Sequence, residues 1–426
     1  MRDTIFALSS GLPPAGLAVI RISGIGARIA IVGMAGQLPK ARVATLARLS
    51  APNGETLDHS LILWFPGPGS VTGEDVAELH LHGGRAVVAA ILSQLSTIEG
   101  FRGAERGEFT RRAFENGRID LGEAEGLSDL LVAETEAQRR SAMLLAEGAL
   151  GTLAAHWNRQ LLSVSAQVEA ILDFSDEDDV SDQSTDLIAA QIAELSDEIA
   201  HHLSRPTAEK IKDGVSIVLA GPPNSGKSTL FNALIGRDAA IVSDIAGTTR
   251  DRIEAPMSLA GNPVVFIDTA GLRDDSEDVI EQIGIERTAS SIASSDILLW
   301  LGPPSQCPAH QRALIVAAKS DIMQANRREG FHVSAVTGAG VDALSHALEG
   351  LVVETLPREG ELALNARHRE ILSDLRARLI GVCQQSDPLL IAEDLRTARM
   401  KLDLLTGRAG VEDMLDALFE NFCIGK

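Results

Sequence analysis

Residues 221–228 read GPPNSGKS, and this segment constrains the fold of the chain more than any other. The pattern G-x-x-x-x-G-K-[S/T] works where a strand ends and a helix begins, because its glycines let backbone N–H groups turn toward phosphate oxygens and the helix N-terminus adds its dipole. An apolar run precedes it at residues 216–220, and a helical stretch follows at residues 229–235. The segment therefore predicts a phosphate-binding loop in a doubly wound α/β domain.

The pattern of apolar, helix-forming and turn residues changes several times along the chain. Residues 1–118 alternate apolar runs with Gly/Pro turns, which indicates an N-terminal α+β domain. Residues 119–209 and 358–426 have helical periodicity, and residues 210–357 alternate strands with helices. We expect one discontinuous helical domain with a Ras-like P-loop domain inserted into it. The expected strands of that insert are residues 216–220, 264–267, 297–301, 314–318 and 331–334.

An acidic segment at residues 173–182 (DFSDEDDVSD) interrupts the first helical region. We interpret it as a solvated loop between two helices. A metal site is the weaker alternative, because its carboxylates do not follow a recognisable ligand spacing.

Composition narrows the class of protein. The net charge of −21 argues against non-specific coating of nucleic acid, although RNA could bind a local basic patch. Tyrosine is absent, so base-stacking platforms are not evident. The cysteines Cys307, Cys383 and Cys423 lie far apart, and no apolar run is long enough to span a bilayer or act as a secretory signal. We expect a cytoplasmic protein that does not enter a membrane.

Further motifs fit a magnesium–nucleotide site. Lys227 should reach the β- and γ-phosphates, and Ser228 should bind Mg²⁺. Asp268 follows an apolar strand and should hold Mg²⁺ through a water, while the Gly271 N–H should sense the γ-phosphate. Thr249, in a loop that contains glycine, is the expected second hydroxyl ligand of Mg²⁺.

The base should be read by residues 318–321 (AKSD). Asp321 can accept hydrogen bonds from guanine N1–H and the 2-amino group, which adenine does not offer, so an ATPase is disfavoured. Guanine-binding proteins usually have Asn where this chain has Ala318. We therefore expect the loss of one contact to the base and of one tether to the phosphate-binding loop.

The expected GTP contacts come from the phosphate-binding loop, the two following loops and the ends of two later strands. They are Asn224, Ser225, Gly226, Lys227, Ser228, Thr229, Ser243, Asp244, Ile245, Ala246, Gly247, Thr248, Thr249, Asp268, Thr269, Ala270, Gly271, Lys319, Asp321, Ser334 and Ala335.

The position that often carries a water-orienting glutamine in GTPases is occupied by Leu272. A leucine can neither donate nor accept a hydrogen bond. The catalytic group must then come from a partner, from a cation, or from the acidic segment 274–281.

Several segments, spread over essentially the whole chain, resemble the tRNA uridine-5-carboxymethylaminomethyl modification GTPase family (MnmE, also called TrmE). They are DTI at 3–5, AVIRISG at 18–24, GEDVAELH at 73–80, HGG at 82–84, GEFT at 107–110, NGRIDL at 116–121, DIAGTTRD at 244–251, DTAGLR at 268–273 and FCIGK at 422–426.

The resemblance implies how hydrolysis proceeds without a glutamine. It implies that K⁺ is bound by Asn224, Ser243, Ile245 and Thr248, and that the nucleotide domains of a dimer meet to complete this loop. Glu281 matches a glutamate that helps to orient the water. Asn224, Thr249 and Glu281 are therefore expected in the hydrolytic machinery.

The resemblance also implies that the N-terminal domain dimerises and binds 5-formyltetrahydrofolate or a related one-carbon tetrahydrofolate. The matching residues are Arg21, Glu78, Arg118 and Lys426. Cys423 resembles a near-terminal catalytic cysteine, although a buried small residue is an equal alternative. His80 and His82 share one face of an expected strand, but a metal site there lacks a visible third ligand.

The implied reaction needs an MnmG-like partner that supplies FAD, in a heterotetramer or larger complex. Together they modify C5 of the wobble uridine of certain tRNAs to carboxymethylaminomethyl- or aminomethyluridine. The tRNA could contact basic side chains of the last helices, and a solvated helix face is the alternative. These side chains are Arg367, Arg369, Arg376, Arg378, Arg396 and Arg399. The competing hypothesis for the whole chain is a regulatory GTPase of ribosome assembly, without folate chemistry.

Overall fold

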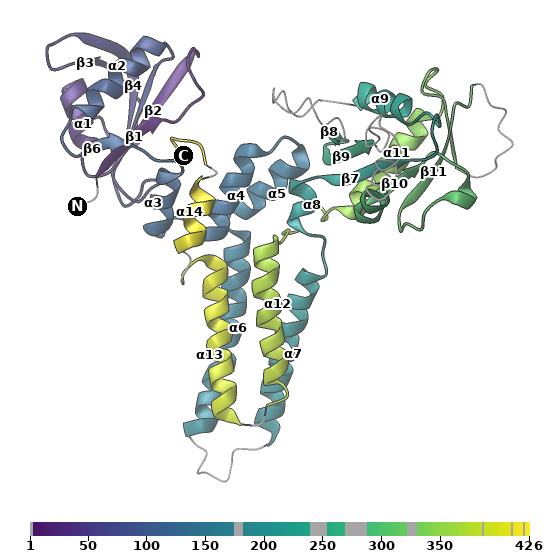
Figure 1. The fold of residues 1–426 in the computed structure, drawn as a ribbon. Coiled ribbons are helices and arrows are strands. Elements are labelled where there is room, and N and C mark those ends of the chain that lie inside the picture. Colours follow the sequence, from purple (N-terminus) through teal and green to yellow (C-terminus); the bar gives the residue numbers. More distant parts are fainter. Residues whose placement is uncertain are drawn as a thin grey trace, which may run out of the picture. The chain divides into compact units, whose positions relative to one another are not determined.

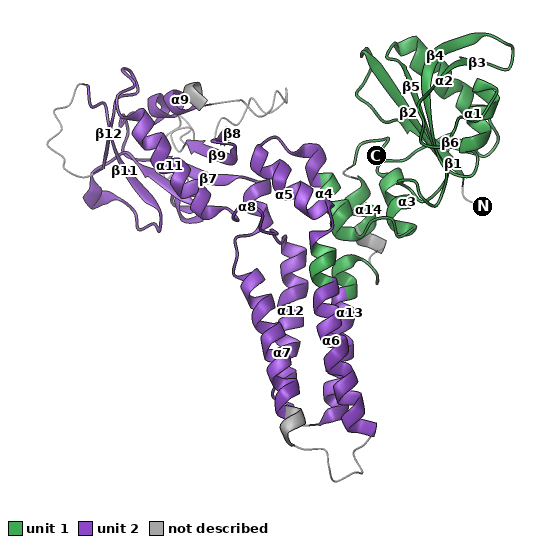
Figure 2. Cartoon of the chain, turned by 180° about the vertical axis from the view of Figure 1, so that it is seen from behind, with its two compact units in different colours: residues 1–128, 150–154, 403–426 green, residues 129–149, 155–402 purple. Residues whose placement is uncertain are grey.

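The computed structural model describes residues 3–173, 182–238, 254–268, 288–321, 330–385, 387–409, 412–420 and 422–426. The chain divides into two compact units. Unit 1 comprises residues 1–128, 150–154 and 403–426, and unit 2 comprises residues 129–149 and 155–402 (Figure 2). The residues of the nucleotide motifs belong to unit 2, and those of the expected folate site belong to unit 1.

Unit 1 contains a six-stranded sheet with the order β3-β4-β5-β2-β1-β6. Its ladders are antiparallel except between β1 and β6. The strands are β1 Thr4–Leu8, β2 Leu17–Ser23, β3 Thr45–Ser50, β4 Thr56–Phe65, β5 Val76–His82 and β6 Phe101–Gly103. The helices packed with them are α1 Ala27–Ala35, α2 Arg85–Ser96 and α3 Glu108–Glu115 (Figure 1). The expectation of an N-terminal α+β domain is confirmed.

The alternation of side chains along the strands decides which face of this sheet is covered. Ile20, Ile22 and Leu79 point into a core that they share with Ala30 and Ile31 of α1 and Ile91 of α2. On the other face, α3 covers β1, where Phe109 packs on Ile5 and Ala7. Leu46 and Leu61, paired across β3 and β4, remain 71% and 44% exposed on that face.

The helical elements confirm the periodicity of the sequence. They are α4 Leu121–Val132, α5 Glu136–Ala146, α6 Ala149–Asp173, α7 Asp182–Leu203, α12 Ala366–Val382, α13 Pro388–Thr406 and α14 Glu412–Glu420. In unit 2, α6, α7, α12 and α13 run side by side (Figure 1). The fully buried Trp157 donates to Glu198 across α6 and α7, 3.2 Å away. Most of the acidic segment, residues 174–181, lies outside the described residues.

The inserted α/β part has the sheet order β12-β11-β10-β7-β9-β8. Its strands are β7 Val215–Ala220, β8 Glu254–Leu259, β9 Asn262–Asp268, β10 Ile297–Trp300, β11 Ala313–Ala318 and β12 Phe331–Val333, and its helices include α8 Ala208–Lys212, α9 Lys227–Asp238 and α11 Val341–Thr355. All five expected strands are present, with ends that differ by a residue or two. The parallel order at β12-β11-β10-β7-β9 confirms the P-loop fold.

Strand β8 was not expected from the sequence. It pairs antiparallel with β9 at the edge of the sheet. Pro256 lies within it, and a proline is tolerated in a strand mainly at an edge, where its missing N–H breaks no ladder. The same proline hides the strand from a sequence pattern.

Among the described residues, we find no helix that is both long enough and apolar enough to cross a membrane.

Candidate nucleotide and N-terminal sites

The phosphate-binding loop joins β7 to α9, as the motif requires. Gly221 has a φ of 153°, and a Cβ there would lie 2.9 Å from the Leu301 carbonyl oxygen, so this position needs a glycine. Asn224 also adopts a left-handed conformation, with a φ of 58°. The Lys227 ammonium donates to the carbonyls of Gly221 and Pro222, at 3.0 and 3.1 Å, and is therefore held against the loop that it should serve.

Two expected magnesium ligands meet beside this loop. Ser228 Oγ donates to Asp268 Oδ2 at 3.1 Å, although the residues are 40 positions apart. Strand pairing explains the contact, because Leu219 of β7 lies opposite Asp268 of β9. Asp268 is only 8% exposed. A hydroxyl and a nearly buried carboxylate form a hard-oxygen donor set, which fits Mg²⁺.

The expected base-reading residues lie at the ends of β11 and β12. Ala318 pairs with Val333, and the Ser320 N–H donates to the Val333 carbonyl at 3.2 Å. These contacts bring the segment with Asp321 toward Ser334, and the Asp321 side chain is exposed while Ser334 is buried. The ends of β11 and β12 thus present an exposed carboxylate, that of Asp321, next to the buried Ser334.

Lys319 supplies a tether to the phosphate-binding loop that the sequence analysis did not foresee. Its ammonium donates to the Asn224 carbonyl at 2.7 Å, from a backbone with a φ of 62°. The Ala318 methyl lies near Gly226, 3.4 Å from where a Cβ would be. The expectation of a missing tether at Ala318 is therefore incomplete, because the next residue joins the same two segments.

Twelve residues of the expected nucleotide machinery lie outside the described residues. They are Ser243, Asp244, Ile245, Ala246, Gly247, Thr248, Thr249, Thr269, Ala270, Gly271, Leu272 and Glu281.

In unit 1, the expected folate residues Arg21 and Glu78 lie opposite each other on β2 and β5. Arg21 Nε and Nη2 donate to Glu78 Oε1 at 3.0 and 2.8 Å. Both point from the sheet face that α1 and α2 leave open. The Arg21 guanidinium carbon is 5.8 Å from the centre of the Phe109 ring, a cation–π distance. The Arg21–Glu78 ion pair therefore rests over the ring of Phe109, which is itself only 2% exposed.

Lys426 reaches the same place through the last segment of the chain. The Phe109 N–H donates to the Lys426 carbonyl at 3.2 Å, and Ser9 Oγ donates to the Gly425 carbonyl at 2.8 Å. Gly425 has a φ of 98°, and a Cβ there would meet the Leu8 carbonyl oxygen at 2.2 Å. Only glycine permits this approach. Cys423, two residues earlier, is exposed, which argues against the alternative of a buried small residue.

Arg118 and the two histidines complete this region. Arg118 is exposed and packs its stem near Gly73, at the loop before β5. His80 Nε2 lies 3.4 Å from Glu78 Oε2, while His82 Nδ1 lies 2.7 Å from Asp58 Oδ1. The histidines thus have separate carboxylate partners. In the part of the chain that the structure describes, no group of three or more His, Cys, Asp or Glu residues could hold a metal.

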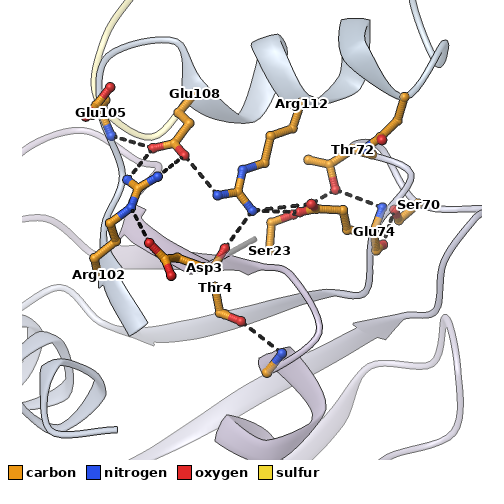
Figure 3. Close-up of polar contacts among 12 residues, drawn as sticks. Asp3, Thr4, Ser23, Ser70, Thr72, Glu74, Arg102, Glu105, Glu108 and Arg112 are labelled. Carbon is orange, nitrogen blue, oxygen red and sulfur yellow. Dashed lines mark hydrogen bonds and ion pairs between the residues drawn. The ribbon is translucent and has the colours of Figure 1, made fainter. Parts of the chain in front are cut away.

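Sequence analysis missed a buried ion-pair network that joins α3 to the neighbouring strands and loops (Figure 3). Arg112, 4% exposed, contacts Glu74 and Glu108, and Arg102 also pairs with Glu108. Burial acts to raise the pKa of Glu108, but hydrogen bonds from Arg102, from the Glu105 N–H and from Arg112 outweigh it and lower the pKa from 4.5 to about 2. The i, i+4 spacing of Glu108 and Arg112 was the available signal.

Some of the arginines of the last helices that were proposed to contact tRNA already form hydrogen bonds or ion pairs within unit 2. Arg369 donates to the carbonyls of Leu203 and Arg205, at the end of α7. Arg378 pairs with Asp374, and Arg396 pairs with Glu393. Contact with tRNA through these residues stays a prediction.

Comparison with known proteins gives consistent matches along the chain. Residues 4–118 match the family model described as the GTP-binding protein TrmE N-terminus, and residues 121–423 match the one described as the MnmE helical domain. The tRNA modification GTPase MnmE of Erythrobacter litoralis is 53% identical over 426 residues, which is all of both chains. The protein of the same name from Novosphingobium aromaticivorans is 53% identical over 437 residues, again across both full lengths. That of Rhizorhabdus wittichii is 54% identical over 430 residues, covering 100% of this chain and 97% of its own.

Proposed function

This chain belongs to the MnmE family of tRNA modification GTPases, and we propose that it hydrolyses GTP in a potassium-dependent manner to drive modification of the wobble uridine in certain tRNAs. It is a GTP hydrolase of tRNA processing. The proposed product is carboxymethylaminomethyl- or aminomethyluridine, formed at C5 together with an MnmG-like protein that supplies FAD. We propose a cytoplasmic location for this chain, because its proposed substrate is tRNA.

The contact between Ser228 and Asp268 carries the nucleotide part of the proposal. Magnesium, when bound, would offset charge on the phosphates, and Ser228 with Asp268 would hold it directly and through a water. Lys227 would leave its carbonyl partners for the β- and γ-phosphates. Asp321 would accept hydrogen bonds from guanine N1–H and the 2-amino group. The backbone of Ser334 and Ala335 would contact the guanine oxygen. Thr249 is proposed as the second hydroxyl ligand.

Asn224 supports the potassium proposal. It is exposed within the phosphate-binding loop, and Lys319 fixes its backbone carbonyl, so its side chain can face a cation beside the phosphates. A monovalent cation there offsets the charge of the transition state, as an arginine finger does. Ser243, Ile245 and Thr248 are proposed as its other ligands, and Glu281 as the residue that orients the water.

The open face of the N-terminal sheet supports the folate and dimer proposals. Arg21 and Glu78 offer charge and hydrogen bonds to 5-formyltetrahydrofolate, the buried Phe109 ring supports Arg21 from beneath, and Lys426 and Arg118 are proposed as further contacts. The exposed Leu46 and Leu61 provide apolar area for a second copy. We propose a homodimer through this domain, which joins the flavin protein in a heterotetramer or larger complex.

The functional division of the chain belongs to the same proposal. Residues 1–118 form the dimerisation and folate-binding domain, residues 119–209 and 358–426 form the helical domain, and residues 210–357 form the GTPase domain. Cys423 is proposed to take part in the folate-linked chemistry.

The decisive experiment is steady-state GTP hydrolysis in matched potassium and sodium buffers. Sodium is smaller and should fit the oxygen cage poorly, so turnover should rise strongly in potassium. Asn224→Ala should abolish that rise with a modest loss of GTP affinity, because Lys227 and Mg²⁺ still hold the phosphates. Equal rates of the unaltered protein in the two salts would refute the cation mechanism.

The competing function is a regulatory GTPase of ribosome assembly. It predicts no folate binding and an unchanged set of tRNA nucleosides. Mass spectrometry of tRNA from cells that lack this chain separates the two functions, because only the tRNA-modifying role predicts loss of the wobble modification.

A further inference from the structure

We infer that Arg112, a residue that does not reach the open sheet face, is the positioning residue of the N-terminal site. The inference rests on the folate site proposed above. The residues expected to bind folate come from four separate segments, namely β2, β5, the loop after α3 and the last residue, 426. Arg112 is buried in α3, and its contacts join the segments that carry these residues (Figure 3).

The first connection runs to β2 and β5 through Glu74. Arg112 Nη1 donates to Glu74 Oε2 at 3.0 Å. The same carboxylate oxygen accepts from Ser23 Oγ at 2.8 Å. Ser23 is the last residue of β2, two positions after Arg21, and Glu74 lies in the loop that enters β5, four positions before Glu78. Arg112 therefore fixes the shared end of the two strands that carry the Arg21–Glu78 pair.

The second connection runs through Glu108 to Phe109, the aromatic residue beneath Arg21. Arg112 Nη2 donates to Glu108 Oε1 at 2.9 Å, and Arg102 holds the same carboxylate from β6. The next residue, Phe109, stacks under Arg21 and donates to the Lys426 carbonyl. Arg112 Nη1 also donates to the Asp3 carbonyl at 2.9 Å, at the start of β1. These contacts hold helix α3 so that the buried Phe109 ring packs on Ile5 and Ala7 and lies beneath Arg21.

The third connection reaches Arg118 through Thr72. Thr72 Oγ1 lies 2.8 Å from Ser23 Oγ, and its carbonyl accepts from Asn116 Nδ2 at 2.7 Å. The neighbouring Gly73 packs against the Arg118 stem. A planar guanidinium can serve carboxylates and a carbonyl in different directions at once, whereas an ammonium is a compact point charge. The position therefore calls for arginine and not lysine.

The test is calorimetric titration of the full chain with 5-formyltetrahydrofolate, with GTP turnover measured on the same preparations. Arg112→Met should weaken folate binding by about 10-fold or more, the cost of losing a charge-assisted hydrogen bond, while GTP turnover is unchanged. The matched control is Arg111→Met on the same helix, whose partners Glu115 and Asp416 form exposed ion pairs, and it should stay within about twofold.

A double variant distinguishes lost hydrogen bonds from an unpaired charge. Arg112→Met leaves the Glu74 carboxylate without its Arg112 partner, while Glu108 keeps Arg102. Adding Glu74→Gln removes that charge but restores none of the hydrogen bonds from residue 112, so the double variant should bind folate as weakly as Arg112→Met. Recovery of wild-type affinity in the double variant would trace the loss to the unpaired charge and overturn the inference.

Three further cases are decisive. If Arg112→Met does not fold, Arg112→Lys serves instead: a loss of several-fold supports the inference, and wild-type affinity overturns it. If the unaltered chain binds no folate, the proposed folate site fails and this inference fails with it. Wild-type binding that is lost in Arg21→Ala but kept in Arg112→Met overturns the inference alone.

Discussion

The nucleotide site and the N-terminal site are built in opposite ways. The phosphate-binding loop is one run of eight residues, in which backbone N–H groups and a single strand-to-helix turn provide most of the function. The N-terminal site takes Arg21, Glu78, Phe109 and Lys426 from across the chain, and β-pairing and buried charges bring them together. The first kind of site tolerates changes elsewhere, whereas the second depends on residues that never touch its ligand.

The largest effect is expected from a variant that disrupts the nucleotide site alone. Lys227→Ala removes the ammonium that should reach the β- and γ-phosphates, and turnover should fall by about 100-fold or more, the range for removing one preorganised charge from a transition state. Folate affinity should not change, because Arg21 and Glu78 lie in the other unit. Steady-state GTP hydrolysis and folate calorimetry on one preparation measure both. A parallel loss of folate binding would contradict the independence of the two sites.

The reciprocal change is Arg21→Ala. It removes a charge-assisted contact and leaves Glu78 without its ion-pair partner, so folate binding should weaken by roughly 10- to 100-fold. GTP turnover should stay at the wild-type value. Calorimetry is the measurement, with Arg85→Ala, an exposed residue of α2 on the covered side of the sheet, as the control. Wild-type folate affinity in Arg21→Ala would remove Arg21 from the site.

Asp321→Asn tests how much of the nucleotide site depends on a single side chain. The carboxylate is the expected acceptor for two guanine donors, so GTP affinity should fall by about 10-fold or more. Xanthosine triphosphate should bind better to the variant, because its 2-oxo group can accept from the new amide. Competition binding with the two nucleotides reports the switch. Unchanged preference for guanine would mean that another group reads the base.

The smallest expected effect concerns the acid stability of unit 1. The pKa of Glu108 is lowered from 4.5 to about 2 in the folded protein, so its contribution is present above pH 4.5 and is lost as the pH falls from 4.5 toward 2. The shift corresponds to at most about 3 kcal/mol, and to about 1–2 kcal/mol after allowance for solvent screening.

Glu108→Gln should therefore lower the free energy of unfolding at neutral pH and flatten its dependence on pH between 4.5 and 2. Denaturant unfolding followed at several pH values measures both changes. Glu115→Gln, on the same helix but in an exposed ion pair with Arg111, is the control and should differ little from wild type. An identical acid profile in Glu108→Gln would show that this carboxylate does not couple to folding.

The sequence by itself determined the α/β insert, its five parallel strands, the phosphate-binding loop and the helical regions on either side. Each of these is local: a glycine pattern, an apolar run or a 3.6-residue period reports the structure of its own segment. It also identified Arg21, Glu78 and Lys426, but only through resemblance, since nothing in their spacing brings them together.

The tertiary structure decided what long-range contacts alone can specify. The β2–β5 register placed Arg21 opposite Glu78, the β7–β9 register placed Asp268 beside Ser228, and Lys319 tied the base-reading segment to Asn224. The edge strand β8 and the Arg112 network were visible in no sequence pattern that we recognised. Strand register and buried ion pairs depend on partners far away in the chain, so no window of sequence contains the information that selects them.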